Sequence, residues 1–426
     1  MLDLKFIREH PDLVKRGIKN KGEMGDVDKI LHLDSKRRSI IQEVEHLKHQ
    51  RNELSRQVSR LKRQGKSADD VITQTREISQ KIKSLDDQLK QVEVELRNEL
   101  DQIPNLPHNS VPVGKDASEN VVVRAWGKIP EFDFEISDHL EIAERLDIVD
   151  FPRGSKISGR GFPVYKGMGA QLERALINFM LDTHISQHGY REIYPPFMVN
   201  RESMRGTGQL PKLEEDMYFC EKDDLFLIPT AEVPVTNLHR NEVLFADQLP
   251  IKYCAFSACF RREAGSWGKE TRGFLRLHQF NKVELVKIVE PQHSYDELEM
   301  LVKDACHILE LLGIPYRVVE LCTGDLSFAA AKCYDIEVWS PAEKTWLEAS
   351  SCSNFEAFQA RRMNLRYRPS STSKPEFPHT LNGSGLATSR LMVSLLEINQ
   401  TDEGSVIVPE PLRRYTGFGV IKRKVY

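Results

Sequence analysis

The sequence has few cysteines and lacks any long apolar run. Only seven of its 426 residues are cysteines; their number is odd, none lies in the first half, and no two have CxxC spacing. We therefore expect neither a disulfide framework nor a structural zinc site. No stretch approaches the ~20 apolar residues that a membrane-spanning helix needs. The first 20 residues are dense in charge and lack the apolar core of a signal peptide. These absences predict a cytoplasmic protein without membrane contact.

A large excess of charge of one sign is also missing. The chain has 60 Lys and Arg against 63 Asp and Glu, a net charge of −3. The chain as a whole is therefore not a basic nucleic-acid-binding protein, and contact with RNA would require a local concentration of positive charge. Its length and its hydrophobic content of 40% are sufficient for a large core and a second domain.

Two heptad patterns indicate a helical hairpin at about residues 30–100. In each, apolar residues recur at alternating steps of three and four, which is typical of helices that pack along one stripe. Gln64–Gly65–Lys66–Ser67 separates the two patterns as a short turn. Three prolines within nine residues begin at Pro104 and indicate a linker. We predict an N-terminal domain at 1–104 and a second domain at 105–426.

Positive charge is concentrated on one arm of this hairpin. Residues 36–63 contain nine basic and three acidic side chains, whereas residues 66–101 contain six basic and nine acidic ones. Five basic residues lie close to the predicted turn: Arg56, Arg60, Lys62, Arg63 and Lys66. One interpretation is a solvated coiled-coil surface. The other is an arm that grips the phosphates of a long RNA helix, whose deep groove hides its base edges.

The second domain has mixed patterns that predict an α+β fold. Helical periodicity covers 171–187 and 297–312, the latter ending at Gly313. Strand-like segments occur at 192–199, 251–263, 274–288, 335–339 and 346–351. Strands joined as hairpins and interleaved with helices favour an antiparallel sheet with surrounding helices.

One predicted hairpin carries an unusual set of polar side chains. Alternation places Arg261 and Glu263 on one strand face, and the returning strand places Arg276, His278, Phe280, Lys282 and Glu284 on one face. The intervening segment 264–273 has three glycines and two basic residues, so we expect a mobile loop that favours anions. Unpaired charges on a buried face are costly, so these residues indicate a site. The alternative is a solvent-facing surface with cross-strand ion pairs.

A second candidate segment runs from Gly383 to Arg390. Two glycines before a helix would allow close backbone approach to a ligand, and a helix N-terminus favours anions. Arg390 points away from the apolar face of the predicted helix but lies between the apolar residues Leu386 and Val393, so we expect it to have a fixed anionic partner. That partner could be a structural carboxylate or a phosphate.

These segments resemble the three motifs of class II aminoacyl-tRNA synthetases, in the order of that family. Phe260–Arg261–Arg262–Glu263 with His278–Gln279–Phe280 is similar to motif 2, and Gly383–Arg390 is similar to motif 3. His188–Pro196 resembles motif 1. Thr230–Ala231–Glu232, His379–Gly385 and the helical hairpin are similar to the seryl subgroup. The resemblance covers essentially the whole chain.

The resemblance implies a reaction and a set of site residues. It implies activation of serine with ATP and transfer to the 3′ end of tRNA(Ser), and it leaves open whether tRNA(Sec) is also a substrate. Arg261 and Arg390 are the implied catalytic residues. The implied ATP contacts are Arg261, Arg262, Glu263, Leu277, Phe280, Glu348, Ala349, Ser350, Ser351 and Arg390. The implied serine contacts are Thr230, Ala231, Glu232, Arg261, Glu284, Asn382 and Ser384.

The resemblance also implies partners. Glu348 and Ser351 would bind Mg²⁺ together with the ATP phosphates, and the basic residues near the hairpin turn would bind tRNA. A homodimer would form through the motif 1 region, with Pro196 at its interface. Simple alternation pairs Glu348 with Ser350 rather than Ser351, so this metal assignment predicts a bulge at Ala349–Ser350.

Three other functions are compatible with parts of the sequence. A catalytically inactive, tRNA-binding relative would be expected to lose Arg261, Glu263, Glu348 or Arg390, and all four are present. A relative that loads a carrier protein would not need the basic hairpin. A coiled-coil scaffold with a globular head predicts no nucleotide chemistry dependent on an amino acid.

Overall fold

The computed structural model describes residues 1–263 and 273–423, which form two compact units. The smaller unit contains residues 2–19 and 23–104. The larger unit contains Met1, residues 20–22 and residues 105–426. None of the helices in the described ranges has the length and apolar content needed to cross a bilayer.

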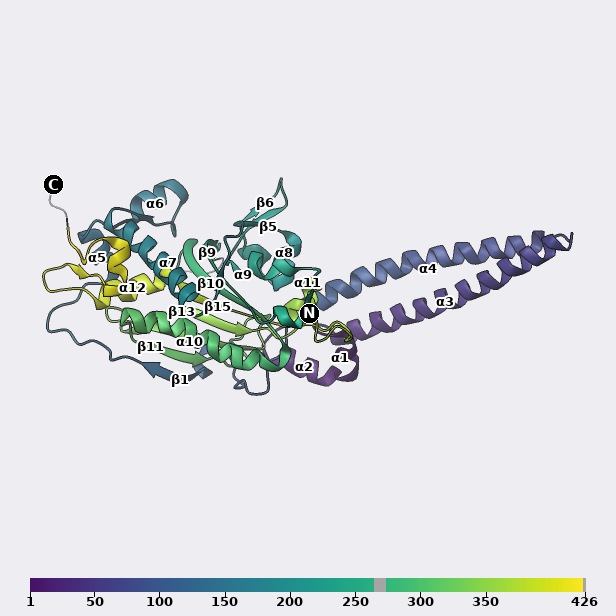
Figure 1. Cartoon of the computed structure of the whole chain (residues 1–426), viewed down its shortest axis with the longest axis horizontal. Helices are drawn as coiled ribbons and strands as arrows, with labels where there is room; N and C mark the ends of the chain where they lie inside the picture. Colours follow the sequence, from purple (N-terminus) through teal and green to yellow (C-terminus); the bar gives the residue numbers. More distant parts are fainter. Residues whose placement is uncertain (264–272, 424–426) are drawn as a thin grey trace. The chain divides into compact units, whose positions relative to one another are not determined.

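The smaller unit is dominated by two long antiparallel helices (Figure 1). They are α3 (Val27–Arg63) and α4 (Asp69–Gln102), preceded by the short helices α1 (Leu4–Glu9) and α2 (Pro11–Asn20). The predicted heptad stripe is the buried stripe, with Ile40 and Val44 of α3 and Leu85 and Val92 of α4 all less than a tenth exposed. The predicted hairpin is confirmed.

Ion pairs connect the two long helices beside the apolar stripe. Nε of Arg37 lies 3.1 Å from Oε1 of Glu93, and Nζ of Lys81 lies 2.7 Å from Oε1 of Glu43. Because these pairs are exposed, each contributes little free energy. We infer that they mainly favour one register of α3 on α4.

The larger unit is built on an eight-stranded sheet, which confirms the predicted α+β class. Neighbouring strands are antiparallel except β4 and β9, which are parallel. In spatial order the strands are β1 (Val121–Trp126), β11 (Tyr316–Glu320), β12 (Lys332–Ser340), β13 (Thr345–Asn354), β15 (His379–Ala387), β10 (Gln279–Val289), β9 (Ile251–Phe260) and β4 (Arg191–Glu192).

The two faces of β10 have different environments. Val283 and Leu285 enter the main core, which is completed by α7 (Met168–Ser186), α10 (Ser294–Leu312) and α12 (Thr388–Ile398). Val286, on the opposite face, packs near α9 (Glu232–Thr236), and Ile288 packs near α11 (Phe358–Met363). Because side chains alternate along a strand, residues 280, 282 and 284 share the face of α9 and α11.

Smaller elements complete this unit. They are α5 (His139–Arg145), β2 (Val149–Asp150), α6 (Phe151–Ser158), β3 (Val164–Tyr165), β5 (Met198–Asn200), α8 (Arg201–Thr207), β6 (Phe219–Cys220), β7 (Leu225–Leu227), β8 (Val243–Phe245), β14 (Arg366–Arg368), β16 (Val406–Ile407), α13 (Glu410–Thr416) and β17 (Val420–Ile421).

Three predicted strands differ from the structure, and one of them, predicted at 251–263, ends at Phe260. The segment predicted as a strand at 192–199 contains only the end of β4 and the start of β5, because Pro195 and Pro196 have no N–H to donate to a sheet. The strand predicted from 274 begins at Gln279, and Phe274 instead lies fully buried in the core. The helix predicted at 297–312 starts three residues earlier and ends before Gly313, which has a φ of +68°.

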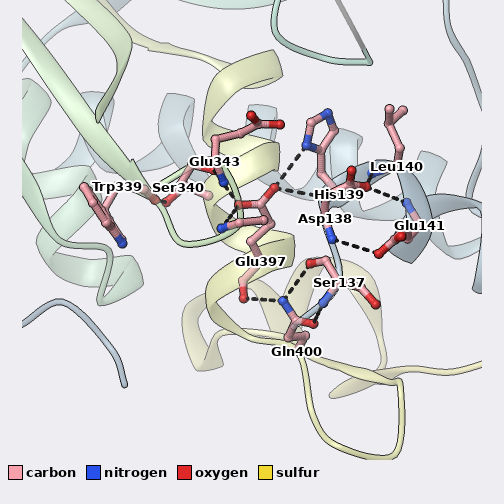
Figure 2. Close-up of polar contacts among 12 residues, drawn as sticks. Ser137, Asp138, His139, Leu140, Glu141, Trp339, Ser340, Glu343, Glu397 and Gln400 are labelled. Carbon is pink, nitrogen blue, oxygen red and sulfur yellow. Dashed lines mark hydrogen bonds and ion pairs between the residues drawn. The ribbon is translucent and has the colours of Figure 1, made fainter. Parts of the chain in front are cut away.

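A buried carboxylate fixes the C-terminal turn of α12 (Figure 2). Oε1 of Glu397 accepts from the backbone N–H of His139 at 3.1 Å and lies 3.0 Å from its Nδ1. Oε2 accepts from the Ser340 hydroxyl at 2.6 Å and from the Ala342 N–H at 3.2 Å. Glu397 is fully buried, so these donors replace its lost hydration. They join α12 to α5 and to the β12–β13 turn.

Candidate active site

A cavity of about 510 Å³ opens on the face of β10 that carries residues 280, 282 and 284. It brings together Arg261, which follows β9, and residues from β10, β13, β15, α9 and α12 that are far apart in the sequence. The sequence-predicted residues that line it are Thr230, Glu232, Arg261, Glu263, Leu277, Phe280, Glu284, Glu348, Ala349, Ser350, Ser351, Asn382, Ser384 and Arg390.

Two predicted contact residues do not line this cavity. Ala231 is fully buried beside Val235 and Val286, so its side chain belongs to the core. Arg262 is exposed, and its backbone N–H donates to the Asp216 carbonyl at 2.9 Å.

Arg261 lies at the cavity wall immediately after the end of β9. Its Nε donates to the carbonyl of Pro229 at 3.3 Å, and its guanidinium carbon lies 5.2 Å from the centre of the Phe280 ring. The planar cation therefore rests on an aromatic face. This arrangement places a permanent positive charge beside a flat apolar surface that could stack on a base.

Arg390 lines the same cavity from the first turn of α12. Its Nε donates to the Leu275 carbonyl at 3.2 Å, and its NH1 donates to the carbonyl and to Oε2 of Glu348, at 2.9 and 3.2 Å. The fixed anionic partner expected for this arginine is thus the carboxylate of Glu348 in the ligand-free protein. The pair remains partly exposed and open to a competing anion.

The predicted role of the two glycines near Arg390 is wrong. Gly383 and Gly385 lie inside β15 rather than at the start of the helix, which begins at Thr388. A Cβ atom would lie 2.6 Å from Sγ of Cys352 at position 383 and 2.5 Å from Nε2 of His184 at position 385. The glycines therefore allow protein side chains, rather than a ligand, to approach the backbone.

Glu263 does not continue the strand that was predicted for it. Strand β9 ends at Phe260, and Glu263 has a φ of +49°, so its side chain leaves the alternation. Its Oε2 accepts from Nε of Arg276 at 2.6 Å. His278 does not line the cavity and stacks on Phe162 at 5.5 Å between ring centres. The mobile loop was predicted at 264–273. Residues 264–272 of this segment lie outside the part of the chain that the structure describes.

The predicted bulge on β13 is confirmed. Ile336 pairs with Ser350 and the next residue, Glu337, pairs with Glu348, so Ala349 is the extra residue. The bulge shifts the alternation, and both Glu348 and Ser351 line the cavity. They offer carboxylate and hydroxyl oxygens, the donor type that Mg²⁺ prefers.

One end of the cavity contains a buried cluster of opposite charges. Glu284 on β10 and Ser384 on β15 are directly paired across the sheet, so their side chains share the cavity face. The Thr230 hydroxyl donates to Oε2 of Glu284 at 3.0 Å, and Lys282 forms an ion pair with the same carboxylate. The side chains of Lys282 and Glu284 are only 8% and 2% exposed, which explains why each needs the other.

Glu232 is the second carboxylate at this end. Its Oε1 accepts from Nε2 of Gln359 at 2.7 Å, and its backbone N–H donates to the Thr230 hydroxyl at 3.2 Å. Burial, and then the negative charge of Glu284, raise the pKa of Glu232 to about 7. The hydrogen bond from Gln359 opposes this shift but does not cancel it.

The sequence analysis did not assign roles to two residues of this cluster. Lys282 was placed on the correct strand face, but nothing in the sequence indicated that it neutralises Glu284. Gln359 lies on α11, 70 residues beyond the end of β10, and has no local pattern that distinguishes it from a surface glutamine. Only the folded chain brings its amide to Glu232.

The basic residues near the hairpin turn are all exposed, as a nucleic-acid contact would require. The five are Arg56, Arg60, Lys62, Arg63 and Lys66. Arg56 donates to Glu53 at 2.9 Å within α3. They belong to the smaller unit.

Comparison with known proteins identifies the family. Residues 1–107 match the seryl-tRNA synthetase N-terminal domain, and residues 217–399 match the tRNA synthetase class II core domain for G, H, P, S and T. The chain is 60% identical to a serine–tRNA ligase from a Geobacillus strain, WCH70, over 98% of this chain and 99% of that protein. It is 57% identical to the Carboxydothermus hydrogenoformans enzyme over the full length of both.

Solved structures agree with this assignment. The crystal structure of seryl-tRNA synthetase from Pyrococcus horikoshii complexed with ATP matches with a TM-score of 0.94 and 38% identity, and the match covers all of both chains. The Giardia lamblia prolyl-tRNA synthetase, 18% identical with a TM-score of 0.55 over 64% of this chain and 54% of that one, shares the fold. The chain therefore belongs to the seryl-tRNA synthetase family, with a catalytic core of the class II type.

Proposed function

We propose that this protein is a serine–tRNA ligase of protein biosynthesis. It activates serine with ATP, forming seryl-adenylate and pyrophosphate, and then transfers serine to the 3′ end of tRNA(Ser). The observation that carries the proposal is the convergence of Arg261 and Arg390 on one cavity that is also lined by the buried carboxylates of Glu232 and Glu284. Cations for a nucleotide and anions for an ammonium group thus share one site.

The first step requires alignment rather than proton transfer. The serine carboxylate, already ionised, attacks the α-phosphorus of ATP; an O–P bond forms, and the bond to pyrophosphate breaks. Negative charge develops on the phosphate oxygens, so preorganised cations stabilise the transition state. Arg261 would bridge the α-phosphate and the serine carboxylate. Arg390 would leave Glu348 to bind the far end of the triphosphate.

The rest of the nucleotide site follows from the same geometry. Phe280 would stack on adenine, and Glu263 would accept a hydrogen bond from its amino group. The oxygens of Glu348 and Ser351 fit Mg²⁺, which commonly takes one or two protein oxygens together with substrate phosphates. When bound, Mg²⁺ would neutralise charge on the phosphates and the leaving pyrophosphate.

Serine would bind at the buried charge cluster. Glu232 and Thr230 would hold its α-amino group, and Glu284 and Ser384 would contact its hydroxyl. Alanine would leave the buried acceptor of Glu284 without its donor, at a cost of about 1–3 kcal/mol. This pocket is therefore suited to distinguish serine from an amino acid without a hydroxyl.

The second step joins the activated serine to RNA. The 3′-terminal ribose hydroxyl of the tRNA would attack the acyl carbon of seryl-adenylate and release AMP. The basic residues near the turn between α3 and α4 would neutralise tRNA phosphates. We also propose that the active form is a homodimer through the motif 1 region, His188–Pro196.

The proposal is tested by serine-dependent exchange of pyrophosphate into ATP. Arg261→Ala should reduce exchange at least 100-fold while the protein remains folded, because the cation at the reacting phosphate is lost. Arg366→Ala provides a matched control, since Arg366 is exposed on β14 and does not line the cavity. Near-normal exchange in the Arg261 variant, or exchange led by another amino acid, would refute the assignment.

A further inference from the structure

Strand β15 contains a bulge immediately after Ser384. On the facing strand Glu284 pairs with Ser384 and Lys282 pairs with Ala387, so Gly385 and Leu386 together oppose one residue. A bulge leaves backbone groups outside the ladder, and buried backbone groups must find other partners. Leu386 is fully buried, so these groups cannot be satisfied by bulk water.

Helix α7 supplies partners from two side chains that lie one helical turn apart. The N–H of Leu386 donates to Sδ of Met180 at 3.1 Å, and the carbonyl of Gly385 lies 2.6 Å from Nε2 of His184. A carbonyl oxygen only accepts, so Nε2 of His184 must carry the proton. The imidazole also occupies the space where a side chain at position 385 would lie.

Two further histidines favour this protonation state. His184 is buried, which lowers its pKa to about 3 and keeps the ring neutral, so its Nδ1 is an acceptor. Nδ1 of His188 lies 2.9 Å from it and must donate; burial lowers the pKa of His188 and favours the neutral ring, whose Nε2 is then an acceptor. Nδ1 of His307 lies 2.9 Å from that atom and donates in turn. The three rings thus form a directed chain that ends at the Gly385 carbonyl.

We propose that His184 is a positioning residue for serine binding, because it holds the β15 bulge and thereby orients Ser384 in the serine pocket. This inference rests on the proposed function. Ser384 is held from the other side as well, since its carbonyl accepts from the Ser350 hydroxyl at 2.6 Å. Two side chains, one from α7 and one from β13, therefore hold two consecutive carbonyls beside the pocket.

The position of this contact determines which substrate is affected. Ser384 is on β15 next to the bulge and faces Glu284, whereas Phe280 and Arg261, the proposed contacts of adenine and the α-phosphate, lie outside β15. A loosened bulge should therefore raise the KM for serine and leave the KM for ATP nearly unchanged. A general loss of folded protein would lower kcat and change neither KM.

The test compares two substitutions that differ in where they place an amide donor. The side chain of His184→Gln can put an N–H near the former Nε2 and should keep the KM for serine within about threefold of wild type. His184→Asn puts its amide near the former Nδ1 and should raise that KM roughly tenfold or more, with the KM for ATP within twofold. Equal serine KM values for the two variants would overturn the proposal.

A measurement on the wild-type protein covers the case in which the asparagine variant fails to fold. Nuclear magnetic resonance of protein with ¹⁵N-labelled histidine should show the proton of His184 on Nε2, with the signal assigned by its loss in His184→Gln. A proton on Nδ1 would overturn the proposal. If the wild-type protein shows no serine-dependent exchange, both the proposed function and this inference are refuted. If His184→Asn is active with a normal serine KM, only the inference is refuted.

Discussion

The raised pKa of Glu232 predicts that serine binding weakens as the pH falls below about 7. The proposed partner of Glu232 is the α-ammonium group of serine, which requires the ionised carboxylate. With a pKa of about 7 in the free protein, roughly one tenth of the molecules have ionised Glu232 at pH 6, against most of them at pH 8. The KM for serine should therefore rise about tenfold from pH 8 to pH 6.

Pyrophosphate exchange measured over this pH range gives the test. The KM for serine should follow the titration, whereas the KM for ATP should not. Glu232→Gln should raise the serine KM and remove its pH dependence, because the amide does not ionise. Calorimetry in two buffers of different ionisation enthalpy should detect release of about half a proton per serine bound at pH 7. A serine KM that is flat between pH 6 and 8 in the wild-type protein would refute the reasoning.

The raised pKa of Glu232 also makes stability depend on pH. The dependence is opposite in direction to that caused by a salt-bridged carboxylate. The folded-state pKa of Glu232, about 7, lies above its ordinary value of 4.5, so the folded protein binds more protons than the unfolded chain between these values. Stability therefore falls as the pH rises from 4.5 to 7. Glu232→Gln should raise the free energy of unfolding by up to about 3 kcal/mol at pH 8 and by almost nothing at pH 4.5.

Two further predictions concern the hairpin and α12. Replacing the five basic residues near the hairpin turn by alanine should leave pyrophosphate exchange unchanged and raise the KM for tRNA. The salt dependence of tRNA binding should become less steep by about one unit of slope per lost phosphate contact. Lys83→Ala with Lys90→Ala on α4 is the control, and unchanged tRNA binding in the fivefold variant would exclude the arm. Glu397→Ala should lower the free energy of unfolding by about 3 kcal/mol, since it leaves buried donors of Ser340 and Ala342 without an acceptor. An unchanged urea midpoint would show that the network in Figure 2 contributes no stability.

Periodicity and motif spacing predicted the features that depend on local sequence. The helical hairpin, α7, α10 and the cavity face of β10 follow from alternation that extends over many residues. The bulge at Ala349 was predictable only because two assigned residues, Glu348 and Ser351, could not otherwise share a face. That prediction needed a functional constraint in addition to the pattern.

Features that depend on long-range packing could not be predicted in this way. The prediction of a strand at 192–199 did not take account of two prolines. The prediction of a strand from 274 did not take account of the burial of Phe274 in the core. Gly385 was predicted to let a ligand approach the backbone. Nothing in the sequence shows that His184, 201 residues earlier, occupies that space. The contact of Gln359 with Glu232 is of the same kind.

The alternation along β10 limits how the specificity of this enzyme can be redesigned. Val283 and Leu285 pack in the core, and the even-numbered residues from 280 to 284 form the base of the substrate cavity. An engineer who enlarges the pocket by changing Glu284 also disturbs the neutralisation of Lys282, and one who moves the strand disturbs Leu285. Altered amino-acid preference is therefore better sought in cavity walls outside the sheet, such as Gln209.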